Sequence, residues 1–87
     1  MPRIVVTHAI QDPERWLGGR AERLAAVPGA RNVTDFLALD GSHHAAVALE
    51  VDDVEAFTAM MATMPPDVAA QAESHGVIPP ITVFVEA

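Results

Sequence analysis

A chain of 87 residues can build one hydrophobic core but not two, so residues 1–87 are expected to form a single domain. Its formal net charge of −7, with only five Lys and Arg, disfavours nucleic acid and anionic membranes as partners. The sequence has no cysteine, which excludes disulfides, thiolate catalysis and Cys-based metal sites.

Hydrophobic residues make up 51% of the chain, a high share for a small domain. No run approaches the ~18 apolar residues of a membrane-spanning helix, and no secretory signal opens the sequence. We therefore expect a cytoplasmic protein. A domain of this size buries only about 60–65% of its unfolded surface, so a second copy is expected to cover the excess apolar surface in a homodimer.

The first element is a β-branched run over residues 3–10 that stops at Asp12-Pro13. Such a run is typical of a strand buried on both faces and central in its sheet. His8 lies inside it. Burying an imidazole costs free energy unless the ring is hydrogen-bonded or used, so His8 is the first candidate functional residue.

A helix is predicted over residues 13–27, with Asp12 as N-cap, Pro13 in the first turn and a stop at Pro28-Gly29. Gly18-Gly19 interrupts it at a cost of about 1 kcal/mol each relative to Ala. These glycines indicate either close packing or ligand approach at the helix, or a tolerated weak point. Most charged side chains are expected on its outer side: Arg15, Arg20, Glu22 and Arg23.

Two strands are predicted over residues 32–39 and 43–51, joined by the turn signal Asp40-Gly41 as a hairpin. A second helix opens at residues 52–55, where Asp52 and Glu55 have capping-box spacing. Its apolar stripe has the regular spacing of a core-facing helix: Val54, Phe57, Met61 and Met64.

Pro65-Pro66 breaks this helix, and a second short helical piece is predicted over residues 67–74, ending at Gly76. Residues 77–80 are expected to form an extended connector. The last strand is predicted over residues 81–86, with prolines only at its entry, where no ladder donor is needed.

The resulting order, βαββαβ, predicts an α+β, ferredoxin-like fold. Right-handed crossovers give a four-stranded antiparallel sheet of order 4-1-3-2 with the helices on one face. The other face would be bare in a monomer, and two such sheets packed together would bury its small residues: Val5, Thr7, Ala9, Ala46 and Ala48.

This topology brings several polar residues and one tryptophan to one sheet edge: His8, Asp12, Trp16, Asp40, His43, His44 and His75. Strand alternation predicts that His8 and His43 face the helices, while His44 faces the partner subunit. A neutral histidine at this edge can abstract a proton while a second group polarises a carbonyl. His8 is the expected base, assisted by His75 or His43 and oriented by Asp12 or Asp40.

Large apolar side chains are expected to line the adjoining sheet–helix pocket and to suit a planar ligand. They are Trp16, Phe36, Phe57, Met60, Met61 and Met64. Purely structural explanations remain for each candidate. His43-His44 fits an exposed hairpin shoulder, His75 a cation at a helix C-terminus, and the Met and Phe stripe a core.

No metal site and no cofactor are predicted. The sequence contains no H-x-x-x-H or H-x-H spacing, and the adjacent His43 and His44 would point to opposite faces. It also lacks a phosphate loop, a dinucleotide-binding fingerprint and a serine nucleophile elbow.

The segment Ile4-Val5-Val6-Thr7-His8 with residues 12–16 resembles the small dimeric α+β barrel proteins. So do residues 51–57 followed by Met64-Pro65. The tail over residues 76–86 looks like the ending of polyketide-cyclase-like and antibiotic-biosynthesis-monooxygenase-like members. The resemblance covers nearly the whole chain through structural motifs, and it implies a homodimer with a pocket in each subunit.

Relatives in this superfamily include cofactor-free monooxygenases of aromatic polyketides, polyketide cyclases, haem-degrading enzymes and muconolactone isomerases. The histidine that polyketide-cyclising relatives carry after the second helix has no match here, where Pro65-Pro66-Asp67 stands. The resemblance implies binding of an apolar, aromatic or polyketide-like molecule. The expected chemistry is cofactor-independent cyclisation, isomerisation or oxygenation, and the alternative is a non-catalytic ligand-binding or dimerisation module.

Overall fold

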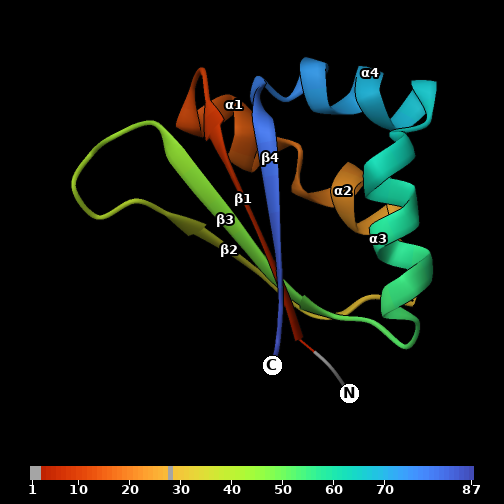
Figure 1. Cartoon of the computed structure of the whole chain (residues 1–87). Coiled ribbons are helices and arrows are strands. Elements are labelled where there is room, and N and C mark those ends of the chain that lie inside the picture. Colours follow the sequence, from red (N-terminus) through yellow and green to blue (C-terminus); the bar gives the residue numbers. More distant parts are fainter. Residues whose placement is uncertain (1–2, 28) are drawn as a thin grey trace.

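The computed structural model describes residues 3–27 and 29–87 (Figure 1). Eight elements follow one another: β1 (Arg3–Ile10), α1 (Pro13–Gly18), α2 (Arg20–Ala26), β2 (Arg31–Leu37), β3 (His44–Glu50), α3 (Val54–Thr63), α4 (Pro66–Ser74) and β4 (Val77–Val85). All neighbouring strands pair antiparallel in the order β2-β3-β1-β4. The helices lie on one face of this sheet (Figure 1), so the predicted ferredoxin-like topology is confirmed.

Strand β1 occupies the centre of the sheet between β3 and β4. Every second residue is buried under the helices: Ile4, Val6, His8 and Ile10. The intervening Val5, Thr7 and Ala9 are only half-buried in this single chain, because no helix or strand within residues 3–27 and 29–87 covers the outer sheet face. The prediction of a central strand is confirmed, whereas full burial on both faces is not reached within one chain.

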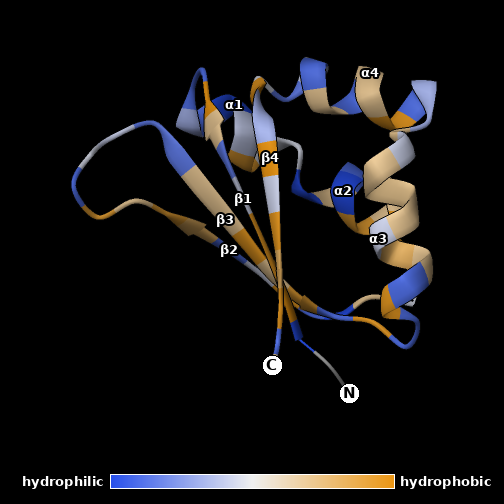
Figure 2. Cartoon of the chain, in the orientation of Figure 1, coloured by the Kyte–Doolittle hydropathy of each residue, from blue (hydrophilic) through white to orange (hydrophobic). Residues whose placement is uncertain are grey.

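The main core lies between the sheet and α3, where Ile4, Leu49, Val51 and Phe57 are buried together with Val6. Burying an aliphatic or aromatic side chain of this size contributes about 1.5–3 kcal/mol, so this cluster anchors α3 to the sheet. Figure 2 shows hydrophobic residues along β1, β3 and β4 and along α3. A second, smaller cluster of Ile10, Trp16 and Ala45 lies at the other end of β1.

The predicted helix 13–27 is two helices in the structure, because Gly19 leaves the helical conformation at φ −87°, ψ 4° and caps α1. Asp12 is its N-cap, as predicted, and accepts a hydrogen bond from the Glu14 backbone N–H. Pro28, part of the predicted stop, lies outside the described residues.

The predicted capping box of the second helix is wrong. Asp53, not Asp52, accepts the hydrogen bond from the Ala56 N–H at 3.0 Å, while the carboxylate of Asp52 pairs with Arg31. The helix ends at Thr63, and its C-cap Met64 adopts a left-handed conformation (φ 43°) directly before the two prolines.

The connector predicted at residues 77–80 is instead the first part of β4. Val77 pairs with Ile10 and Ile78 with Ala9, after which the register shifts between Ala9 and Thr7. This irregularity absorbs Pro79 and Pro80, which lack ladder donors, so the strand continues through them.

Candidate functional site

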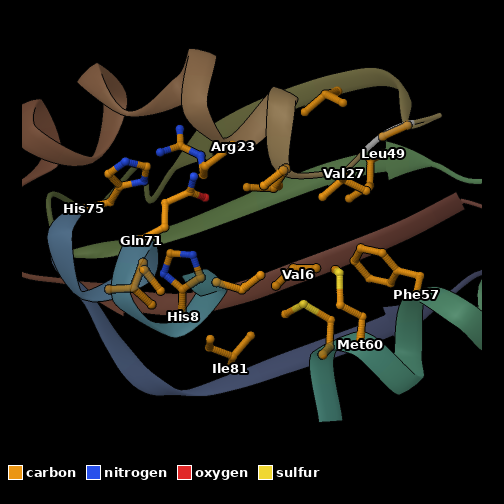
Figure 3. A pocket seen from close by; sticks show the side chains of 18 of the residues that line it. Val6, His8, Arg23, Val27, Leu49, Phe57, Met60, Gln71, His75 and Ile81 are labelled. Atoms are coloured by element: carbon orange, nitrogen blue, oxygen red, sulfur yellow. The ribbon is translucent and has the colours of Figure 1, made fainter. Parts of the chain in front are cut away.

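A cavity of about 140 Å³ lies between the sheet and helices α2, α3 and α4 (Figure 3). Among the described residues its wall is apolar except for four polar side chains, His8, Arg23, Gln71 and His75. In Figure 3, Arg23, Gln71 and His75 gather at one end, His8 lies close by, and Phe57 and Met60 lie at the other. Other apolar members of the wall include Val6, Val27, Leu49, Met61, Met64 and Ile81.

His8 enters this cavity because strand alternation turns it toward the helices, where it is 8% exposed. Its Nδ1 lies 3.1 Å from the Ala9 carbonyl oxygen. A carbonyl only accepts, so this contact assigns the proton to Nδ1 and leaves Nε2 of the neutral ring unprotonated. Burial lowers the pKa of His8, the Ala9 hydrogen bond opposes this, and the Arg23 charge lowers it further. The ring is therefore a neutral base at pH 7.

Arg23 and His8 are joined through Trp16. The guanidinium carbon of Arg23 lies 4.1 Å from the Trp16 ring centroid, a cation–π contact. The Trp16 ring meets His8 edge-on at 5.7 Å and 72°. Arg23 also pairs with a carboxylate. Its Nη2 donates to Asp35 Oδ2 at 3.1 Å, and Arg20 pairs with the same oxygen at 3.0 Å. Burial lowers the pKa of Arg23 and Asp35 opposes this, so the guanidinium stays charged beside the cavity.

His75, the C-cap residue of α4, lies at the polar end of the cavity. Its Nε2 lies 3.2 Å from Glu22 Oε2, and Gln71 donates to the Glu22 carbonyl at 3.3 Å. The ring packs against Gly19 so tightly that a Cβ there would lie 2.5 Å from the ring. Of the alternatives for the two helix glycines, close packing therefore holds for Gly19, whereas Gly18 has open space around it.

The structure brings some of the predicted site residues together and separates others. His8, His75, Phe57, Met61 and Met64 line the cavity. Trp16 is fully buried behind His8 rather than in the cavity wall, and Phe36 lies on the opposite sheet face, 51% exposed. Phe36 points away because it alternates with Asp35, which faces the helices.

His43 does not reach the cavity. Strand β3 begins only at His44, so the alternation that predicts a helix-facing His43 does not extend to it. His43 is exposed, and its carbonyl accepts from the Ile10 N–H at 2.9 Å. The expected orienting residues also act elsewhere: Asp12 caps α1, and Asp40 accepts from the Ser42 N–H in the hairpin loop. The Ala9 carbonyl orients His8 instead.

Arg23 and Gln71 are polar cavity residues that the sequence does not single out. Arg23 follows Trp16 by seven residues, which is two turns of the single helix predicted from the sequence and would place both on one face of that helix. Gln71 lies three residues after Val68 and four before His75, the period of a single helix face. This spacing is the available signal, but the prediction that Arg23 lies on the outer side is wrong. That prediction rests on the general rule that charged residues are exposed, and Arg23 is an exception to this rule.

Within residues 3–27 and 29–87, no group of three or more His, Asp or Glu side chains is arranged to hold a metal ion. No helix in this described part of the chain is long and apolar enough to cross a membrane.

These features define a ferredoxin-like α+β protein with a pocket between its sheet and its helices. This is the fold of the antibiotic biosynthesis monooxygenase-like proteins, as the sequence resemblance predicted. No protein-family model and no curated protein matches the sequence.

Several solved protein structures superpose on this chain. A candidate antibiotic biosynthesis monooxygenase from Bordetella bronchiseptica superposes with a TM-score of 0.70 at 11% identity, covering 99% of this chain and 94% of that one. SnoaB, a cofactor-independent oxygenase from Streptomyces nogalater, gives 0.60 at 17% identity, covering 95% and 89%. A monooxygenase from the gene ActVA-Orf6 of Streptomyces coelicolor, in complex with nanaomycin D, gives 0.60 at 19% identity, covering 98% and 84%. At these identities the likeness establishes a shared fold.

Proposed function

We propose that this protein is a cytoplasmic homodimer that binds an apolar, aromatic or polyketide-like small molecule between sheet and helices. It acts on that molecule by cofactor-independent acid/base chemistry, with His8 as the general base. The observation that carries this proposal is the position of His8 in the wall of a mainly apolar cavity, with Nδ1 against the Ala9 carbonyl oxygen, a contact that assigns the free lone pair to Nε2. A base placed there can take a proton from a carbon or oxygen acid, with Arg23 beside the developing negative charge.

The anion so formed would cyclise or isomerise, or react with dioxygen by its own chemistry. The fold neighbours support this range, since SnoaB is a cofactor-independent oxygenase and the ActVA-Orf6 protein holds nanaomycin D. His75, which lies beside Glu22, is proposed to assist at the same polar end of the cavity. The cavity-lining side chains of Phe57, Met61 and Met64 would supply a wall that adapts to a planar ring.

The homodimer is proposed from the outer sheet face. Small half-buried residues of β1 and β3 form its centre, and two exposed aromatic side chains flank them, Phe36 at 51% and Phe84 at 55%. Apolar surface of this kind on a sheet is commonly covered by a second protein layer. A second copy packed sheet to sheet would bury it.

The test uses the single tryptophan of the chain, since Trp16 contacts both His8 and Arg23. Nanaomycin D is titrated against the protein while Trp16 fluorescence is followed, and the oxidation of anthrone by dioxygen is measured in parallel. We expect saturable binding and accelerated oxidation, with His8→Gln losing at least about 10²-fold in rate. His44→Gln, on the exposed hairpin shoulder, is the matched control and should keep both properties.

Binding of nanaomycin D without any acceleration would instead favour the non-catalytic module. Loss of both binding and oxidation in the His44→Gln control would contradict the assignment to His8.

A further inference from the structure

We propose that the polar end of the cavity recognises one phenolic ring, with the hydroxyl held between His8 Nε2 and Arg23. The ring itself would lie against Val6, Ile81 and Met60. This inference rests on the proposed function and specifies the chemical class of its ligand. It is carried by the cavity's size, by the polar groups at one end and by the charges around them.

The cavity volume sets the size of the buried part of the ligand. At about 140 Å³ it matches the roughly 150 Å³ of an engineered apolar cavity that binds benzene. One aromatic ring therefore fits inside, and further fused rings would extend past the wall. Val6 and Ile81 lie between His8 and the Met60–Phe57 end in Figure 3, so a ring placed there reaches the polar groups with one edge.

The polar groups form an acceptor–donor pair. His8 Nε2 has no hydrogen-bond partner within the described part of the chain, because the Ala9 carbonyl takes only Nδ1. Arg23 has five N–H donors, and the bonds to the Trp16 carbonyl and to Asp35 use one on each terminal nitrogen. The remaining donors are available to a ligand oxygen. Both side chains contact the same Trp16 ring, which holds them in place.

This pair selects among oxygen and nitrogen ligands. A hydroxyl donates to Nε2 while its oxygen accepts from Arg23, so both groups are satisfied at once. A carboxylate has no proton to donate to Nε2, and a protonated amine would meet the Arg23 cation. When the proton transfers, the ligand O–H bond breaks and an N–H bond forms on Nε2, leaving a phenolate beside Arg23 and an imidazolium. No other reactant is needed.

The charged and titratable groups at this end favour a ligand that enters neutral. Arg23 shares Asp35 with Arg20, and the Glu22 carboxylate lies beside His75, so two carboxylates stand near the two guanidiniums before a ligand arrives. The chain as a whole carries −7. A neutral phenol is not repelled by that charge, and it becomes an anion only where Arg23 can stabilise it.

The experiment compares 4-nitrophenol with nitrobenzene, which has the same ring without the hydroxyl. Trp16 fluorescence gives both affinities, and the visible absorbance of the 4-nitrophenolate reports the ionisation of the bound ligand. We expect wild type to bind 4-nitrophenol about tenfold or more tightly than nitrobenzene and to ionise it at lower pH than in water. Arg23→Gln should remove this preference while nitrobenzene binding persists, and Arg3→Gln, at an exposed surface pair with Glu86, should change neither.

Equal affinity of wild type for both rings, or unshifted ionisation of bound 4-nitrophenol, would overturn the inference and leave an apolar ligand site standing. The comparison of 4-nitrophenol with nitrobenzene needs only wild-type protein, so it tests the inference even if Arg23→Gln fails to fold. Binding of neither ring nor nanaomycin D would overturn the proposed function as well. A third ligand, 4-nitro-1-naphthol, distinguishes two kinds of phenolic ligand. If it binds more tightly than 4-nitrophenol and depends on Arg23, the ligand is the phenolic end of a larger molecule. If it binds more weakly, the ligand is a free single-ring phenol.

Discussion

The imidazole of His75 packs directly on Gly19, and a Cβ at residue 19 would lie 2.5 Å from its Cε1 atom. Gly19 is also where α1 ends and α2 begins. The break between the two helices and the end of α4 are therefore built around the same contact. Since His75 lines the cavity, Gly19 positions one wall of the candidate site although it is not itself a lining residue.

Replacing Gly19 with Ala should therefore destabilise the fold. The added methyl cannot fit unless His75 or the α1–α2 junction shifts, and overpacking of this kind costs about 1–3 kcal/mol in the free energy of unfolding. Gly18→Ala is the matched control, because nothing lies within 4 Å of the place where its Cβ would stand and Ala has the higher helix propensity. Urea unfolding measures both. Equal stability of the two variants would show that the His75 ring moves aside freely.

His8 should make the stability of the protein depend on pH. Burial holds the pKa of His8 below its usual value of 6.5, so below about pH 6.5 the unfolded chain binds more protons than the folded one. The free energy of unfolding should fall as the pH drops from that value toward the lower pKa of the folded state. Urea unfolding between about pH 5 and pH 8 tests this, and His8→Gln should flatten the dependence. An unchanged slope in that variant would assign the effect to other groups.

The same titration should appear in ligand chemistry. Only neutral His8 accepts a proton, so the rate of catalysed anthrone oxidation should rise with pH through the lowered pKa of His8 and then level off. Rate measurements at saturating anthrone check this. A rate that is independent of pH over the acidic range would rule out His8 as the base.

Asp35 should contribute to stability through Arg23 and Arg20. Its side chain is only 9% exposed and pairs with both guanidiniums, so Asp35→Asn leaves two cations without their carboxylate. We expect a loss of about 1–3 kcal/mol in unfolding free energy and weaker binding of 4-nitrophenol, since Arg23 is no longer held over Trp16. Glu86→Gln breaks the exposed pair with Arg3 and should change stability by less than about 1 kcal/mol. Comparable losses of unfolding free energy in both variants would show that the ion pairs of Asp35 stabilise the fold no more than the exposed Arg3–Glu86 pair does.

The bare sheet face gives a separate prediction about assembly. Phe84→Glu places a charge among the apolar residues proposed to meet a second copy, and it should shift the protein from dimer to monomer. Leu39→Glu, at the fully exposed hairpin tip, should leave the assembly unchanged. Sedimentation velocity distinguishes the two. A monomeric wild-type protein would contradict the homodimer.

Much of the fold was predictable because its signals are local. The β-branched run of β1, the Asp12-Pro13 helix start and the Pro65-Pro66 break each depend on neighbouring residues, and the element order with right-handed crossovers then leads to the sheet order. The error in the cap of α3 arose where the signal was not local. Asp53 rather than Asp52 caps α3, because Asp52 pairs with Arg31 from another element.

The sequence by itself determined that a histidine lies on the helix-facing side of a central strand, since strand alternation follows from backbone geometry alone. Only the tertiary structure decided what surrounds it. Arg23 turns inward because Asp35 on β2 and the Trp16 ring are there to receive its charge, and His43 stays outside because β3 begins one residue later. Partners of a charged side chain come from distant segments, and no spacing within one segment reveals them.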